Sequence, residues 1–205
     1  MPPRDWTLVL TASLGLAVVS LASNITTTSQ LAGDADTLLT VRSTLSKLVN
    51  SGTVWAGLGI LSGWLVGRPV RGAVAGVVAS LLALVAHYGL GRVTGVFGPD
   101  IWASNASWFV AAAVLGGPLG VVGAIGRRVD RWGLAARLVV PAAAVLEPFV
   151  SGMFAVPSVA PQPDRIASTV CGVVLLVAGV AAGAHLLRRR IASRRPPGAP
   201  TTQPR

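Results

Sequence analysis

The chain has 205 residues, of which 52% are hydrophobic and 12% charged, and its mean hydropathy is +0.67. Soluble globular domains carry about 25% charged residues, so this composition excludes the soluble class and indicates a membrane protein. The single cysteine, Cys171, excludes a disulfide within one chain. The net charge of +10 is spread along the chain beside apolar segments, which argues against a nucleic-acid partner.

Apolar segments close to the ~20 residues that a helix needs to cross ~30 Å of hydrocarbon recur along the chain. They predict an all-α membrane protein with six transmembrane helices in one domain of residues 1–190. The expected spans are residues 6–23, 52–67, 72–90, 106–126, 134–154 and 167–187. The alternative, a soluble helical bundle, would need polar helix faces that these segments lack.

The first span also resembles a cleavable secretory signal, because a basic start precedes an apolar centre and a Ser-Leu-Ala sequence ending at Ala22. We expect it to remain as a helix, since multi-span bacterial proteins usually insert without cleavage. Cleavage would leave five spans and would not change the orientation of the others.

A short amphipathic helix is predicted over residues 36–49, between the first two spans. Leu38, Val41, Leu45 and Leu48 recur at helical spacing, and Asp36 is placed to cap the start. We expect this helix to lie on the outer surface of the membrane. A helix that binds a partner protein is the alternative.

The basic residues predict which side of the membrane each loop faces, because Lys and Arg are retained on the cytoplasmic side during insertion. With alternating spans, thirteen of them fall on one side: Arg4, Arg68, Arg71, Arg127, Arg128, Arg131, Arg137, Arg188, Arg189, Arg190, Arg194, Arg195 and Arg205. The other side receives four: Arg42, Lys47, Arg92 and Arg165. Both termini are therefore expected in the cytoplasm, and the protein in the inner membrane of a bacterium.

The last fifteen residues, 191–205, hold four prolines and few apolar side chains, which predicts a disordered, basic cytoplasmic tail. The arginines before and within this tail can contact anionic lipid headgroups, so the lipid bilayer is the expected partner. No nucleic-acid partner is expected.

Glycine spacing predicts where helices pack closely. Gly59, Gly63 and Gly67 form a stripe on one face of the second span, and small residues let membrane helices approach each other. We expect this stripe in the bundle interior, with a dimer interface as the alternative.

The second and third spans resemble the fourth and fifth. Asn-Ser-Gly at Asn50 and Asn-Ala-Ser at Asn105 each open a span, and each pair of spans turns at a Gly-Arg sequence. This correspondence indicates a parallel hairpin repeat, although glycine-rich helices also align by chance.

Two ionisable side chains lie inside predicted spans, His87 in the third and Glu147 in the fifth. Both fall in the outer third of the membrane, where Asn50 and Asn105 can cap the spans that start there. These four residues are the candidate intramembrane polar site, with Glu147 expected close to His87 or Asn105. A charged carboxylate at mid-membrane costs about 2.5–3.5 kcal/mol, so a partner or water must offset it. The site is either an outward-opening proton- or cation-sensitive site, or a hydrogen-bonded pair that fixes helix register.

Three stretches carry a family resemblance: LVNSGTVWAGLGILSGWLVGRP, SNASWFVAAAVLGGPLGVVG and AAAVLEPF. They resemble a family of small integral membrane proteins of high-GC bacteria, known as a domain of unknown function. The resemblance covers residues 50–187 and brings no activity with it. It implies that Asn50, Trp55, Asn105, Trp108 and Glu147 are pattern positions.

Hydrolytic, metal-binding and nucleotide-binding motifs are absent from the sequence, which disfavours catalysis and gives no reason to expect a cofactor or a metal. We therefore expect a multi-pass membrane protein of structural or accessory character. The alternative is a small transporter or sensor that uses an outward-facing polar site around Glu147 and His87.

Overall fold

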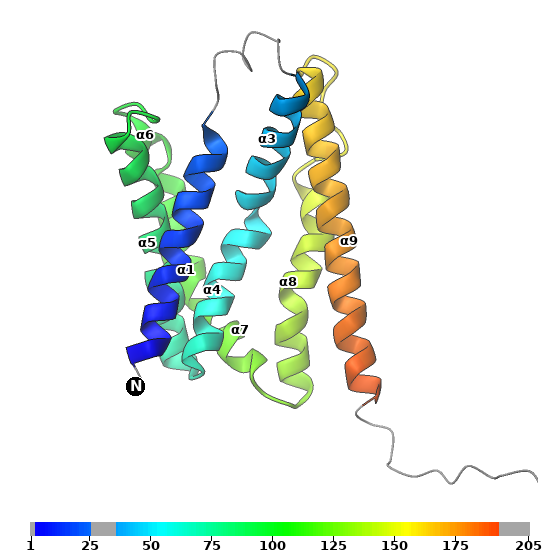
Figure 1. Cartoon of the computed structure of the whole chain (residues 1–205). Coiled ribbons are helices and arrows are strands. Elements are labelled where there is room, and N and C mark those ends of the chain that lie inside the picture. The colour runs from blue at the N-terminus through cyan, green and yellow to red at the C-terminus, as the bar shows by residue number, and fades with distance from the viewer. Residues whose placement is uncertain (1–2, 26–35, 193–205) are drawn as a thin grey trace, which may run out of the picture.

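The computed structural model describes residues 3–25 and 36–192, and over these residues the chain is helical without strands. The elements in chain order are α1 (Pro3–Asn24), α3 (Asp36–Val49), α4 (Gly52–Val66), α5 (Pro69–Val93), α6 (Ile101–Ser104), α7 (Ala106–Gly126), α8 (Arg131–Val150) and α9 (Gln162–Ala192). Apart from the short α6, the helices run up and down in one bundle (Figure 1). The all-helical fold predicted from the sequence is confirmed for this part of the chain.

Five described helices are long and apolar enough to cross a membrane: α1, α5, α7, α8 and α9. The membrane class is therefore supported by structure as well as by composition. The second predicted span corresponds to α4, which has only 15 residues. At 1.5 Å per residue α4 is about 22 Å long, which is less than the ~30 Å of a bilayer core.

The helix α3 matches the predicted range but not the predicted position. Figure 1 shows α3 in line with α4 along the bundle, beside the upper part of α9, instead of across the end of the bundle. The guanidinium of Arg42 donates to the Ser23 carbonyl at 3.0 Å, and the Ser46 hydroxyl donates to the Asn24 side-chain oxygen at 2.7 Å. These bonds attach α3 to the end of α1, an interaction that the amphipathic pattern alone does not encode.

The helices extend beyond several of the predicted spans. The last helix begins at Gln162 and continues to Ala192, whereas the apolar window covers residues 167–187. Hydropathy marks the part of a helix that suits lipid, but backbone hydrogen bonding continues into the arginine-rich end. Ile191 and Ala192, which the prediction assigned to a disordered tail, are therefore helical. Residues 193–205 lie outside the described part of the chain.

Glycines allow α4, α5 and α7 to pack with their backbones in contact. A Cβ atom at Gly63 would overlap the Gly120 carbonyl of α7, and one at Gly76 would overlap the Gly116 carbonyl. At Gly59 an added Cβ would lie 3.2 Å from the Leu119 Cβ. The glycine stripe of α4 thus faces α7 inside the bundle.

Gly67 has a different role from the other two glycines of the stripe. Its φ of 72° places it in the left-handed region, and its N–H donates to the Gly63 carbonyl at the end of α4. A glycine adopts this conformation without the steric cost of a Cβ, so Gly67 ends the helix and starts the turn toward α5.

The packing does not reproduce the predicted hairpin repeat. The helix α7 packs chiefly against α4 and α5, whereas α8 packs chiefly against α9. The lengths also differ, with 15 and 25 residues in α4 and α5 against 21 and 20 in α7 and α8. The repeat therefore stays a prediction from sequence.

The turn between α7 and α8 is held by Asp130. Its carboxylate accepts a hydrogen bond from the Gly133 N–H at 3.0 Å and forms an ion pair with Arg128. The Gly133 N–H, with a further contribution from Arg128, holds the pKa of Asp130 below its ordinary value. The guanidinium of Arg190 donates to the Asp130 carbonyl at 2.9 Å, which attaches the end of α9 to the same turn.

Candidate functional site

Glu147 lies in the last turn of α8 and binds the first turn of α4. Its Oε1 accepts a hydrogen bond from the Gly52 N–H at 2.6 Å, and its Oε2 accepts one from the Thr53 N–H at 2.8 Å. The hydroxyl oxygen of Ser51 accepts from the Val54 N–H at 3.3 Å. The first amides of a helix have no acceptor within the helix, so Glu147 and Ser51 together supply hydrogen-bond acceptors for three N–H groups at the start of α4.

The charge of Glu147 is placed where the helix favours it. The N-terminus of a helix carries a partial positive charge, which stabilises a carboxylate beside it. The carboxylate therefore has electrostatic and hydrogen-bond compensation from α4. Within the described part of the chain, both hydrogen bonds of Glu147 go to backbone amides and neither goes to His87 or Asn105. That Glu147 lies close to one of these two residues stays a prediction.

His87 lies on α5 with only 5% of its surface exposed, and it takes part in a second group of polar residues. Its Nδ1 is 3.1 Å from the hydroxyl of Ser20 on α1, and that hydroxyl donates to the Asn50 Oδ1 at 2.5 Å. Because the Ser20 proton is used toward Asn50, His87 donates from Nδ1–H in this arrangement. The imidazole thus helps to connect α1 and α5 to the break before α4.

Neither candidate asparagine caps the start of a span with its side chain, contrary to the sequence-based expectation. Asn50 donates from Nδ2 to the Ser46 carbonyl at 2.9 Å, and Ser51, with extended backbone angles, is the residue that caps α4. Asn105 accepts from the Tyr88 hydroxyl at 3.0 Å and donates to the Ile101 carbonyl at 2.9 Å. The Asn105 side chain is therefore directed back toward α6 and α5, and it accepts no hydrogen bond from the first amides of α7.

An open cleft of about 940 Å³ reaches Glu147. Its polar lining comprises Asn24, Ser46, Lys47, Asn50, Ser51, Glu147, Ser151, Asp164 and Ser168. The Lys47 ammonium and the Asp164 carboxylate form an ion pair at 3.1 Å, which links α3 to the first turn of α9. Glu147 is half-buried and borders this cleft.

A smaller cavity of about 200 Å³ lies beside His87 and Tyr88. Asn50, Gly52 and Trp108 line both this cavity and the larger cleft, so the two spaces adjoin. Glu147 borders one and His87 the other. Asn105 borders neither, and is connected to the smaller cavity only through Tyr88.

The chemistry of this region is that of hydrogen bonding and ion pairing. Within residues 3–25 and 36–192 there is no group of three His, Cys, Asp or Glu side chains that could hold a metal ion. Each Glu147 oxygen accepts one backbone N–H, and a carboxylate oxygen can accept more than one hydrogen bond. The cleft can therefore offer acceptors to a polar molecule without loss of the helix contacts.

Sequence reasoning missed several members of this region: Ser20, Ser51, Tyr88 and the amides of Gly52 and Thr53. The signal for Ser51 was available, because serine before an apolar run is a common helix cap. Ser20 had no comparable signal, since serine inside an apolar helix usually bonds to its own helix. The partners of Glu147 are backbone groups, which no side-chain pattern can identify.

Comparisons with protein-family models, curated proteins and solved structures find no match to this chain. The resemblance to a membrane-protein family of unknown function therefore stays a prediction. Conclusions about function rest on the geometry of the chain itself.

Proposed function

We propose that the chain is a multi-pass protein of a bacterial cytoplasmic membrane that crosses the bilayer six times, with both ends in the cytoplasm. In this proposal α3 and α4 together form the second crossing, broken at Asn50 and Ser51. Figure 1 supports the alternation: the start of α1, the α4–α5 turn, the α7–α8 turn and the end of α9 lie at the same end of the bundle. These are the helix ends that carry most of the arginines.

The side chains of α3 support its inclusion in a crossing. Leu38, Val41 and Leu45 are each more than half exposed, whereas Arg42 and Lys47 are bound to Ser23 and Asp164 of the protein. A helix on a soluble surface has the opposite arrangement, with charges outward and apolar residues inward. Apolar residues outward and charges on protein partners suit a helix in contact with lipid.

We propose a structural or accessory role for the polar region, carried by one observation: Glu147 of α8 caps α4. A break inside a membrane helix leaves amides without acceptors, and hydrocarbon cannot supply them. Glu147 satisfies two of these amides, and Ser51 a third. The intramembrane carboxylate then serves to hold a discontinuous crossing against α8.

Substitutions of Glu147 test this role. Glu147→Ala removes the acceptors of the exposed Gly52 amide and of the partly buried Thr53 amide. An unsatisfied buried donor costs about 1–3 kcal/mol, so most of the loss comes from the Thr53 amide. We expect lower abundance in cells and a lower melting temperature in detergent, with Glu147→Gln intermediate because it keeps one acceptor oxygen. Asp164→Asn is the matched control, since it removes a carboxylate from the same cleft, and the partner of that carboxylate is the half-buried Lys47 and not a backbone amide. A Glu147→Ala protein that melts like the wild type would contradict the role.

The open cleft favours a second candidate function, a small transporter or sensor with an outward-facing polar site. Its volume of about 940 Å³ is ample for a small polar solute, and Glu147 lies at its wall. A screen of polar solutes for a rise in melting temperature tests this candidate. Ser151→Trp, which would fill the cleft without removing a partner of Glu147, should abolish any such rise.

A further inference from the structure

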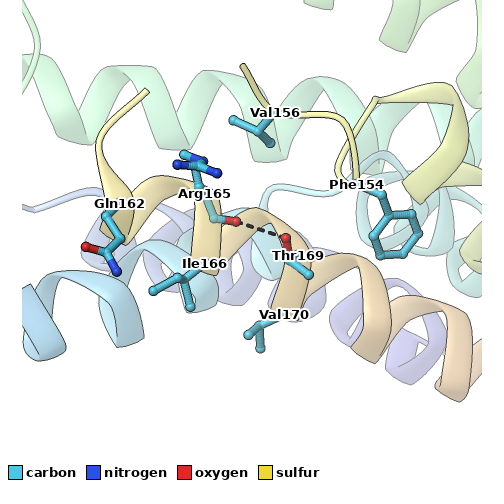
Figure 2. A pocket seen from close by; sticks show the side chains of 7 residues that line it. All are labelled: Phe154, Val156, Gln162, Arg165, Ile166, Thr169 and Val170. Carbon is cyan, nitrogen blue, oxygen red and sulfur yellow. Dashed lines mark hydrogen bonds between the residues drawn. The ribbon is translucent and has the colours of Figure 1, made fainter. Parts of the chain in front are cut away.

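A further open cavity, of about 460 Å³, lies at the start of α9, and Glu147 is not among the residues that line it. Seven residues line it: Phe154, Val156, Gln162, Arg165, Ile166, Thr169 and Val170 (Figure 2). The first two come from the α8–α9 connection and the other five from the first turns of α9. No Asp or Glu is among them, so Arg165 gives this cavity a net positive charge.

The guanidinium of Arg165 is available to a ligand. Among the described residues its side chain has no ion pair or hydrogen bond. Its backbone N–H donates to the Pro161 carbonyl, and its carbonyl accepts from the Thr169 hydroxyl, both at 3.1 Å. The neighbouring carboxylate, Asp164, is bound to Lys47 on the side of the larger cleft. Arg165 therefore has no internal counter-ion, although arginine offers five N–H donors suited to phosphate.

Below Arg165 the surface of α9 is apolar over several turns. Ile166, Val170, Val173 and Val177 recur three or four residues apart and are each between 42% and 61% exposed. This stripe begins within the cavity itself, since Ile166 and Val170 line it together with Phe154. A cation at the top of an apolar stripe matches a molecule with an anionic head and a hydrocarbon tail.

We propose that this cavity binds an anionic phospholipid of the outer leaflet, with its phosphate at Arg165 and an acyl chain along the Ile166–Val170 stripe. Gln162 provides a further hydrogen-bond donor at the level of the headgroup. A free phosphate compound would make the ionic contact with Arg165 but not the apolar contact with α9. A lipid without net charge would make the apolar contact, but its attraction to Arg165 would be weaker. The site thus selects for both parts of one molecule.

Native mass spectrometry of the delipidated, detergent-solubilised protein tests the proposal with phosphatidylglycerol as the probe. We expect one saturable phosphatidylglycerol whose affinity falls about tenfold in Arg165→Gln, because a charge-assisted contact of this kind corresponds to about one factor of ten or more. Thr169→Phe should also weaken binding by filling the cavity, although it keeps the charge. Melting temperatures should be unchanged in Arg165→Gln, because this side chain has no partner in the described structure.

The controls separate this site from general electrostatic attraction and from other occupants. Arg68→Gln removes the same charge at an exposed position at the opposite end of the bundle, and should bind phosphatidylglycerol like the wild type. Phosphatidylcholine should bind several-fold more weakly, and glycerol phosphate should not compete. Equal losses in Arg68→Gln and Arg165→Gln, or competition by glycerol phosphate, would overturn the proposal, as would tight binding that none of these substitutions changes.

Discussion

Glu147 shows how one residue can be located from the sequence while its role stays hidden. A carboxylate in an apolar run must have compensation, and that requirement alone singles out its position. The compensation comes from the amides of Gly52 and Thr53, more than ninety residues earlier in the chain. Every residue offers a backbone amide, so sequence could predict that a partner exists but not which one.

Ser20 is the residue that joins three helical segments, and its substitution should be costly. The hydroxyl is fully buried between His87 and Asn50. Ser20→Ala would leave the buried His87 N–H and the oxygen of the exposed Asn50 without this partner. The loss at a buried group costs about 1–3 kcal/mol, so most of the effect comes from His87. We expect a clear fall in the melting temperature of the purified protein in detergent.

Ser13 provides the matched control on the same helix. It is equally buried, but its hydroxyl donates only to the Val9 carbonyl of its own helix, at 2.8 Å. That carbonyl also lies in the backbone ladder of α1, so Ser13→Ala should change the melting temperature little. If both alanine variants melt alike, the connection through Ser20 does not contribute to stability.

For the helices, the length of the apolar segments predicted which parts of the chain are helical. It did not predict that α3 continues the line of α4. The windows for α1, α5, α7, α8 and α9 correspond to helices long enough to span a membrane. The window for α4 also includes its cap, Gly67, and the helix itself stops at Val66. Hydropathy could not show that α3 continues the line of α4, because Arg42 and Lys47 make α3 polar in composition although both bind protein partners.

The contact between α4 and α7 depends on the absence of a side chain at Gly63. A Cβ there would overlap the Gly120 carbonyl, and backbone atoms cannot move aside as a flexible side chain can. Gly63→Ala should therefore force the helices apart, at a cost of about 1–3 kcal/mol as for other overpacked sites. The expected result is a lower melting temperature in detergent and less folded protein in membranes.

Gly57 tests whether the loss of stability in Gly63→Ala comes from the α4–α7 contact or from replacing a helical glycine by alanine. It lies on the same helix, and a Cβ added there would have nothing within 4 Å. Alanine favours helix by about 0.5–1 kcal/mol over glycine, so Gly57→Ala should be neutral or slightly stabilising. A Gly57→Ala protein as unstable as Gly63→Ala would argue against close α4–α7 packing.

For the whole molecule, the sequence predicted the fold class and an arrangement of the helix ends, whereas the choice of neighbouring helices depends on packing. The arginine-rich ends lie together in Figure 1, as alternation of the spans requires. The preference of α7 for α4 and α5, and of α8 for α9, follows from which glycines meet which carbonyls. Which glycine meets which carbonyl depends on how the helices are placed relative to one another. A stripe of small residues in one helix does not specify the helix that packs against it.

The proposed six crossings can be tested by labelling single introduced cysteines, because the native Cys171 is fully buried and should remain unlabelled. Ile25 follows α1, and Val70 lies in the first turn of α5, so these two positions are separated by α3 and α4. If α3 and α4 form one crossing, a membrane-impermeant maleimide added to spheroplasts should label Ile25→Cys, and should label Val70→Cys only after lysis.

The remaining crossings are tested in the same way at two further connections. Val129 between α7 and α8 is 91% exposed, and Val159 between α8 and α9 is 93% exposed, so both cysteines should react readily wherever the reagent reaches them. We expect Val159→Cys to be labelled in spheroplasts and Val129→Cys only after lysis, because the arginines beside Val129 are retained in the cytoplasm. Labelling of Ile25→Cys and Val70→Cys from the same side would remove the broken crossing and leave the five spans that length alone supports.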